Sequence, residues 1–394
     1  MLSEVTRDAQ EYMLRHADLG LAGWLIHDYR HSNPIFWQVV GENVVNVTRP
    51  CFLFIPDTGE ARLLVHHVDK GKFQTVGIDR VVYRDRSTLL DGLAKLLPDS
   101  GRVAMEYSPM AALPRSSKVD AGTVELVRST GVEVVSSADL LQYATQRWSQ
   151  AQLVSHLRSA DKLGRIVLEA FQYIGQNLAH APTEYQVSQF IRGRFEDEGI
   201  ISPDGPIVAA NGHAGDPHYE PSEEGSSVFK EGDWVLIDLW AKEQAEDGVY
   251  ADITWVAYIG GEVPQRHQEV FQVVATARDS ALKYLEGSAR QGIVLQGCQV
   301  DKIARDYIAR QGYGEYFTHR LGHSIGRDVH ADAVNLDGFE TEDTRSIVPG
   351  ICFSIEPGIY LPEFGVRSEI DVFMSEDGPS ATTPVQREVV LIKS

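Results

Sequence analysis

The chain has 394 residues, of which 43% are apolar and 23% charged, which is ordinary for a globular protein of two or three domains. Its net charge of -20, with no compensating basic stripe, argues against a nucleic-acid partner. No run approaches the ~18 apolar residues of a membrane span, and the charged N-terminus lacks the apolar segment of a signal peptide.

The cysteines Cys51, Cys298 and Cys352 are scattered along the chain. Their spacing fits neither a disulfide framework nor a thiolate metal site, and each is most simply a small buried apolar residue. We therefore expect a protein of the reducing cytoplasm.

The first 148 residues alternate between strand and helix patterns. A charged helix opens the chain, and residues 52–65 form a predicted hairpin around Asp57-Thr58-Gly59. Apolar strands near residues 80–83, 102–107 and 132–135 are separated by helical stretches, which predicts a partly parallel sheet. We expect an α/β domain over residues 1–148. No glycine-rich phosphate loop follows its strands, so no nucleotide is assigned to it.

Residues 149–394 form the second predicted domain. Helices are expected over residues 151–178, from the capping box of Thr183 and Gln186 to Gly199, from Pro264 to about residue 289, and over residues 299–311. Residues 201–221 read as a short strand and a loop that carries His213 and His218.

Residues 234–259 form a predicted hairpin with strands at 235–239 and 249–256 and a polar turn at 242–248. A turn symmetric about residue 245 places Asp238 directly opposite Asp252. Two like charges there are destabilising unless a cation lies between them. A shifted register, or one neutral carboxylate, would equally remove the conflict.

A second, similar hairpin follows. The segments KEGDWVLID and VPGICFSIE each place a glycine six residues before an acid that ends an apolar run, Asp238 and Glu356. A turn at residues 361–365 returns the second hairpin so that Glu356 faces Glu369. Chance produces one such carboxylate pair more easily than two.

The segment HRLGHSIGRDVH, residues 319–330, lies between the hairpins and is too rich in glycine for a stable helix. Its central imidazole, His323, completes a set whose four negative charges balance two divalent cations. Oxygen ligands with one histidine suit manganese, with cobalt or zinc as alternatives, rather than copper. Two such metals can activate a shared water for hydrolysis. The set is Asp238, Asp252, His323, Glu356 and Glu369; the alternative is a solvated acidic face.

These motifs resemble the pita-bread metallopeptidase family, which includes Xaa-Pro dipeptidase (prolidase), aminopeptidase P, methionine aminopeptidase and creatinase. The matching segments are Asp252-Ile253-Thr254, Gly322 to Gly326 with Val329-His330, Ile355 to Gly358, and Val366 to Glu369. The resemblance spans most of residues 150–394. It implies an α+β pita-bread catalytic domain behind a creatinase-like N-terminal α/β domain.

The resemblance also implies roles. Asp238 would bind one metal, His323 and Glu356 the other, and Asp252 and Glu369 both. Glu356 would also act as general base toward the bridging water.

Outside the metal ligands, His218 and His330 match the histidines that stabilise the tetrahedral intermediate and protonate the leaving nitrogen. Both are expected to contact substrate, as is His319, whose role is less defined in the family. Arg367 shares a face with Glu369 and would orient it. Trp240 and the long 242–248 turn depart from the family pattern and would reshape the pocket wall.

The expected activity is hydrolysis of Xaa-Pro bonds, most readily in dipeptides, by two divalent metal ions in each subunit of a homodimer. Alternatives are an aminopeptidase P acting on longer Xaa-Pro-Xaa peptides, a creatinase-like hydrolase without metal, and a silent peptide-binding module. The complete ligand set argues against the last two.

Overall fold

The computed structural model describes residues 2–41 and 47–393, which fall into two compact units, Met1–Arg147 and Trp148–Ser394. Within the described residues, every helix is too short or too polar to cross a lipid bilayer.

The N-terminal unit is built on a six-stranded sheet of order β4-β3-β2-β1-β5-β6. The antiparallel pairs are β1 with β2 and β2 with β3, whereas β3–β4, β1–β5 and β5–β6 are parallel, which confirms the predicted partly parallel sheet. The strands are β1 (Leu21–Asp28), β2 (Cys51–Pro56), β3 (Arg62–His66), β4 (Asp79–Tyr83), β5 (Arg102–Met105) and β6 (Glu133–Ser136). The α-helices are α1 (Leu2–Arg15), α2 (Pro34–Val40), α3 (Arg86–Leu96), α4 (Ala121–Arg128) and α5 (Ala138–Thr145).

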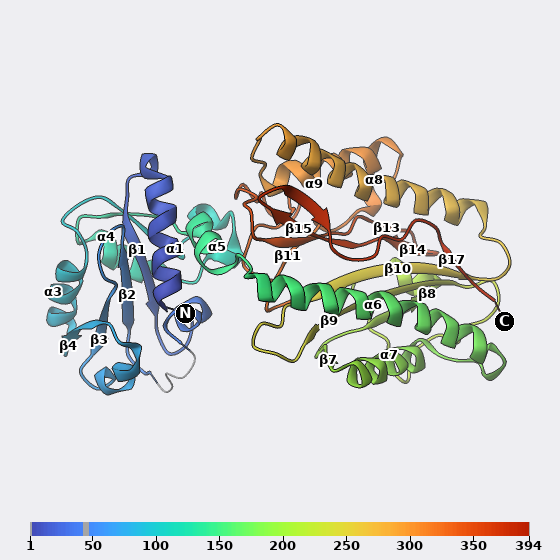
Figure 1. Ribbon diagram of the computed structural model, residues 1–394, viewed down its shortest axis with the longest axis horizontal. Helices are drawn as coiled ribbons and strands as arrows, with labels where there is room; N and C mark the ends of the chain where they lie inside the picture. The colour runs from blue at the N-terminus through green and yellow to red at the C-terminus, as the bar shows by residue number, and fades with distance from the viewer. Residues whose placement is uncertain (1, 42–46, 394) are drawn as a thin grey trace. The chain divides into compact units, whose positions relative to one another are not determined.

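Helices cover both faces of this sheet (Figure 1). Successive residues of β1 point into different cores: Trp24 and Ile26 pack with α1, α2 and α5, and Leu25 packs with α3 and α4. Burial on both faces explains why β1 reads as a continuous apolar run rather than an alternating one.

The C-terminal unit contains four long α-helices and eleven strands among the described residues. The helices are α6 (Gln150–Asn177), α7 (Glu184–Glu198), α8 (Gln265–Arg290) and α9 (Gly297–Arg310). The strands are β7 (Ile200–Ile201), β8 (Ile207–Ala210), β9 (Trp234–Glu243), β10 (Ala251–Ile259), β11 (Ser324–Ile325), β12 (Cys352–Ile355), β13 (Gly358–Tyr360), β14 (Gly365–Arg367), β15 (Ile370–Ser375), β16 (Gly378–Ala381) and β17 (Val390–Ile392).

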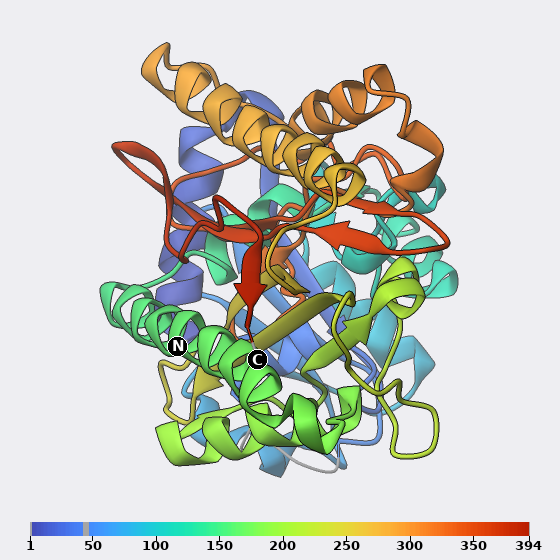
Figure 2. The ribbon, with the colours of Figure 1, turned by 90° about the vertical axis from the view of Figure 1, so that its right-hand side faces the viewer.

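The strands of this unit lie between two pairs of helices, α6 with α7 and α8 with α9, in both ribbon views (Figures 1 and 2). One sheet has β9 at its centre, with β10 on one side, β7 and β8 on the other, and β17 parallel to β10. The second has the order β11-β12-β15-β16, and β13 with β14 forms a short ribbon that continues it. The predicted capping box is present at α7, with hydrogen bonds of 3.0 and 3.2 Å between Thr183 and Gln186.

The β9–β10 hairpin separates an apolar face from a polar one. Odd-numbered residues of both strands, such as Ile237 and Ile253, pack into the core beneath α6 and α7. Even-numbered residues therefore face the second sheet, and this places Asp238 and Asp252 on one face.

The register predicted for this hairpin is wrong by two residues. Asp252 pairs with Trp240, and Asp238 pairs with Thr254. Strand β9 continues to Glu243, where β7 pairs with its end, and the turn of the hairpin is centred one residue later than expected. A shift of two preserves the face and makes the aspartates diagonal neighbours, which removes the direct opposition of like charges.

The register predicted for the second hairpin is confirmed on both sides of its acids. Ile355 pairs with Ile370, and Gly358 pairs with Arg367. Between these ladders the regular pairing breaks, because the backbone N–H of Glu356 donates to Leu321 O at 2.8 Å and that of Glu369 donates to Thr254 O at 3.3 Å. Both glutamates are thereby turned toward neighbouring segments.

Candidate metal centre

Three buried side chains from distant parts of the chain meet in the C-terminal unit. Asp252 on β10, His323 just before β11, and Glu369 between β14 and β15 bring ligand atoms within 4.8 Å of one another. This distance is short enough for one ion to contact all three. These residues are far apart in the sequence and meet because the two sheets that carry them face each other.

His323 is held so that one nitrogen faces the carboxylates. Its Nδ1 lies 3.2 Å from Ser324 O, which can only accept, so Nδ1 carries the proton. Nε2 then presents its lone pair 3.6 Å from Asp252 Oδ2 and 3.4 Å from Glu356 Oε1. Ser354 fixes both partners, because its hydroxyl accepts from His323 N at 2.9 Å and donates to Glu356 Oε1 at 3.1 Å.

Gly322 allows this approach. A Cβ at this position would lie 1.9 Å from Ser354 O, so only glycine lets the loop reach β12. The close contact fixes His323 beside Ser354.

Three carboxylate oxygens in the cluster are buried without a hydrogen-bond partner among the described residues: Asp238 Oδ1, Asp252 Oδ1 and Glu369 Oε1. Leaving such an acceptor unsatisfied in a desolvated site is costly. A divalent cation would satisfy these oxygens, and carboxylates with one imidazole form the hard donor set that such cations prefer. The residues present therefore fit a metal.

The electrostatics of the protein groups alone are consistent with this reading. Burial and the repulsion of neighbouring carboxylates raise the pKa of Asp252 and of Glu369 well above the usual range. Burial also raises the pKa of Asp238, although Arg367 opposes it. Burial tends to raise the pKa of Glu356 as well, but its interactions with His323, His319 and Arg367 hold the pKa below its usual value.

Arg367 is the cation that the protein itself supplies to the cluster. Its guanidinium pairs with Asp238 and donates from Nε to Thr254 Oγ1 at 3.0 Å. The Thr254 hydroxyl in turn donates to Glu369 Oε2 at 2.7 Å. Arg367 and Thr254 thus link acids on both hairpins, and the predicted orienting role of Arg367 toward Glu369 acts through Thr254.

His319 lies at the edge of this network, and hydrogen bonds hold its ring in one orientation. Its Nδ1 donates to Arg320 O at 2.7 Å, and its Nε2 accepts from the Tyr360 hydroxyl at 2.7 Å. The Tyr360 oxygen also accepts from Arg367 Nη1 at 2.9 Å. Burial lowers the pKa of His319 to about 4. Both ring nitrogens are engaged, so His319 holds Tyr360 and Arg367 in place.

The other two histidines are exposed. The His330 ring lies 4.3 Å from the His323 ring and is steeply tilted to it, beside the cluster. The backbone N–H of His218 donates to Asp216, and its ring touches no member of the cluster among the described residues. The segment before it, η6 (Asn211–Gly215), packs on the turn between β13 and β14, where a Cβ on Gly215 would lie 2.3 Å from Leu361 O.

Trp240 stands directly across the hairpin from Asp252. Its ring packs against a small apolar cluster that includes Tyr250 and Ile325, and the backbone of Gly205 lies against its other side. Trp240 is therefore an apolar wall next to the carboxylates.

Sequence reasoning missed Ser354 and Tyr360, although both were accessible to it. Each lies an even number of residues from Glu356 along the second hairpin, which is the spacing of one strand face. Arg345, in the same unit, is buried in a bidentate pair with Asp343, at 2.6 and 2.9 Å. That pairing makes Arg345 structural.

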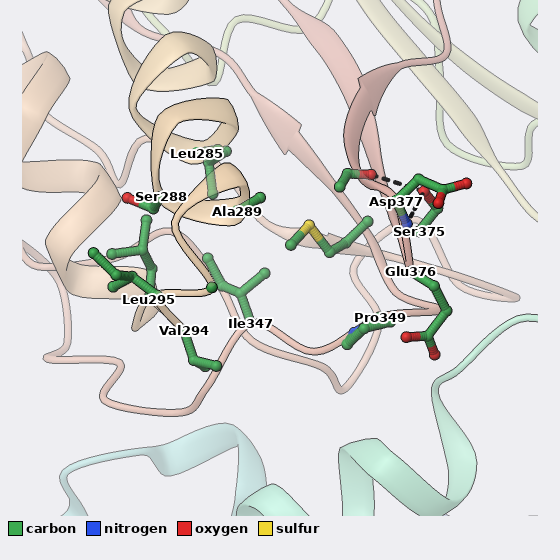
Figure 3. A pocket seen from close by; sticks show the side chains of 14 residues that line it. Leu285, Ser288, Ala289, Val294, Leu295, Ile347, Pro349, Ser375, Glu376 and Asp377 are labelled. Atoms are coloured by element: carbon green, nitrogen blue, oxygen red, sulfur yellow. Dashed lines mark hydrogen bonds between the residues drawn. The ribbon is translucent and has the colours of Figure 1, made fainter.

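A cavity of about 170 Å³ lies elsewhere in the same unit, between the end of α8 and the β15–β16 turn (Figure 3). Its lining is mainly apolar, with Leu285, Ile347 and Met374 among the contributing side chains. It contains no member of the carboxylate cluster, so it is separate from the candidate metal centre.

The comparison with solved structures concerns the fold. The crystal structure of dipeptidase PepE from Mycobacterium ulcerans matches with a TM-score of 0.73 at 23% identity, covering 100% of this chain and 99% of that one. The prolidase from Pyrococcus horikoshii matches with a TM-score of 0.64 at 21% identity, covering 98% and 100%. The predicted fold class, an α/β domain with a pita-bread domain, is confirmed.

Sequence relatives carry related names. The chain is 35% identical to the Xaa-Pro dipeptidase of Lactobacillus helveticus over 188 residues, which is 47% of this chain and 46% of that protein. It is 28% identical over 286 residues to the probable dipeptidase PepE of Mycobacterium bovis, 72% of this chain and 71% of that protein. The model of metallopeptidase family M24 matches residues 158–376, more than half of the chain. The chain therefore belongs to metallopeptidase family M24.

Proposed function

We propose that this protein is a dinuclear-metal exopeptidase that hydrolyses Xaa-Pro bonds, most readily in dipeptides. The observation that carries the proposal is the convergence of Asp252, His323 and Glu369, with carboxylate oxygens left without partners in a buried site. The substrate class is supported by similarity to proteins named Xaa-Pro dipeptidase.

We assign the two ions to five residues. Asp238 would bind one, His323 and Glu356 the other, and Asp252 and Glu369 both. Manganese is the preferred ion, with cobalt or zinc as alternatives. When bound, such a pair supplies Lewis-acid polarisation of the carbonyl and a water of lowered pKa.

The protein groups divide the remaining work. Glu356 accepts the proton of the attacking water, and the Ser354 hydroxyl, 3.1 Å from its Oε1, restrains it. His330, exposed beside His323, and His218 would stabilise the tetrahedral intermediate and help protonate the proline nitrogen. Trp240 supplies an apolar wall for the substrate.

Three further properties belong to the proposal. Residues 1–148 form the creatinase-like domain and residues 149–394 the catalytic domain, which the division of the structure near residue 147 supports. The protein acts in the cytoplasm, as three free cysteines suggest. It forms a homodimer, which light scattering of the purified chain tests directly.

The decisive assay compares Xaa-Pro dipeptides with Xaa-Pro-Xaa tripeptides on manganese-loaded protein. The proposal expects faster release of the N-terminal residue from dipeptides, and no hydrolysis of matched peptides without proline. Preference for the tripeptide would identify an aminopeptidase P instead. Absence of bound metal together with cleavage of small C–N bonds would point to a creatinase-like hydrolase.

A further inference from the structure

The outer edge of β10 lacks a neighbouring strand where Asp252 lies. Strand β17 pairs with β10 only from Ala257 onward, so the backbone groups before it need other partners. The N–H of Asp252 donates to the Asp371 side chain, Oδ2, at 2.8 Å. A side chain from β15 thus replaces a missing strand at a proposed metal ligand.

Asp371 is completely buried and firmly placed. Its N–H donates to Thr383 Oγ1 at 2.8 Å, and its carbonyl oxygen accepts from Thr382 N at 2.8 Å. On β15 it pairs with Ser354, the residue that holds His323 and Glu356. Asp371 therefore belongs to the rigid second sheet and reaches across to β10.

His156 on α6 is fully buried and contacts both segments, the one that leads into β10 and the residues that hold Asp371. Its Nδ1 lies 2.7 Å from Tyr250 O and donates to it, and its Nε2 lies 2.7 Å from Thr382 Oγ1. The same Nε2 is 3.9 Å from Asp371 Oδ2. His156 therefore ties the residue that precedes β10 to the strand segment that holds Asp371.

One feature of Asp371 lacks a purely structural explanation. Its second oxygen, Oδ1, is buried without a hydrogen-bond partner, and no Lys or Arg pairs with this carboxylate among the described residues. A buried acid of this kind is destabilising, so stability alone does not favour it over an apolar residue. Its contact with Asp252 gives it a role.

We infer that Asp371, together with His156, is a positioning residue that fixes the backbone of Asp252 and so aims its carboxylate at the metal centre. This inference rests on the proposed two-metal function. Groups that orient metal ligands through one hydrogen bond commonly change metal affinity by ~10–100-fold when they are lost. Neither Asp371 nor His156 is expected to touch the metal or the substrate.

The test measures Mn²⁺ affinity of metal-free protein by calorimetry. Asp371→Ala removes the acceptor for Asp252 N, and we expect affinity to fall by ~100-fold; Asp371→Asn keeps an oxygen but loses the charge, and we expect ~10-fold. The matched control is Gln386→Ala, because Gln386 makes the equivalent bonds to Val256, at 2.9 and 2.7 Å, four residues along the same edge. The control should bind Mn²⁺ as the wild type does.

Hydrogen exchange, measured by mass spectrometry without metal, gives a second readout. Asp371→Ala and His156→Ala should speed amide exchange in residues 250–253, whereas Gln386→Ala should speed it only near residue 256. If Asp371→Ala does not fold, the Asn variant decides the question. Unchanged Mn²⁺ affinity and unchanged exchange in a folded Asp371 variant would overturn the inference. If the wild type itself binds no divalent metal, the proposed function fails instead.

Discussion

Glu106 in the N-terminal unit and Asp252 in the C-terminal unit are both buried acids, but their oxygens have different surroundings. Glu106 Oε1 accepts from Trp24 Nε1 at 2.6 Å and from Ser137 Oγ at 3.1 Å, and its Oε2 accepts from Asn33 Nδ2 at 3.1 Å. Asp252 Oδ1 has no hydrogen-bond partner in the part of the chain that the structure describes. Both oxygens of the Glu106 carboxylate thus have donors, whereas Asp252 keeps one acceptor available for a ligand.

The same contrast extends over each region. The side chains that donate to the Glu106 carboxylate are all neutral. Burial therefore raises the pKa of Glu106 to about 7, although these hydrogen bonds oppose the shift. Around Asp252, further acids also keep unpartnered oxygens. The first cluster is complete without a ligand, and the second becomes complete only with one.

The largest effect is expected for Glu356→Gln, which removes the proposed base while keeping the side-chain volume. Loss of general-base catalysis should lower kcat for Xaa-Pro dipeptides by ~10²–10⁴-fold. The measurement is steady-state hydrolysis with metal content determined in parallel. Wild-type turnover in a metal-loaded variant would show that Glu356 is not the base.

Glu106→Gln tests the structural acid. Because burial raises the pKa of Glu106 from 4.5 to about 7, the folded state holds its proton more tightly than the unfolded state does. The stability of the wild type relative to the variant should then fall by ~3 kcal/mol between pH 4.5 and 7 and stay level above pH 7. Urea unfolding at several pH values measures this, and a pH-independent difference would contradict it.

Asp252→Asn sharpens the comparison through metal-linked stability. At a Mn²⁺ concentration of 100 times Kd, binding should stabilise the wild type by ~2.7 kcal/mol and raise the Tm of its C-terminal unit. The Asn variant should lose most of this shift, and Glu106→Gln should keep it. Equal shifts in both variants would mean that the ion binds elsewhere.

Tyr360→Phe probes the support of Arg367. The substitution removes the hydroxyl that lies 2.9 Å from Arg367 Nη1 and 2.7 Å from His319 Nε2. A hydrogen bond to a charged group contributes ~1.5–3 kcal/mol to stability, so the Tm should fall. Because Arg367 loses a support, kcat/KM measured on the folded variant should fall as well. An unchanged kcat/KM would show that the Tyr360 hydroxyl is not needed to position Arg367.

The smallest effect is expected at an ion pair near the surface of the protein. Arg158 is half exposed and lies 2.6 Å from Glu243. Because water screens such pairs, Arg158→Ala should cost only ~0.2–1 kcal/mol of stability and leave peptide hydrolysis unchanged. Unfolding by urea and the dipeptide assay check both statements, and a large loss in either would show that this pair matters more than its exposure suggests.

Local patterns in the sequence predicted most of the elements. The capping box at Thr183 and the hairpin at residues 52–65 depend on neighbouring residues, and both are present. The predicted register of β9 and β10 was wrong because it assumed a turn symmetric about residue 245, whereas the observed turn is centred one residue later. The residues of a long polar turn do not distinguish these two centres.

The candidate site divides in the same way. Residues with a distinctive local motif, such as His323 between two glycines, could be singled out in advance. His156 could not, because it lies within an ordinary amphipathic helix and meets Asp371 only through the packing of α6 on the sheet. Supporting residues of this kind become visible only when the contacts between elements are known.

In the proposed centre, two acidic ribbons and one imidazole enclose a pair of divalent cations. The positions of these cations can be located in an anomalous-scattering map from a manganese-soaked crystal. We expect two peaks, ~3.5–4 Å apart, among Asp238, Asp252, His323, Glu356 and Glu369. A map without a peak among these side chains, from protein that hydrolyses Xaa-Pro dipeptides, would contradict the proposed centre.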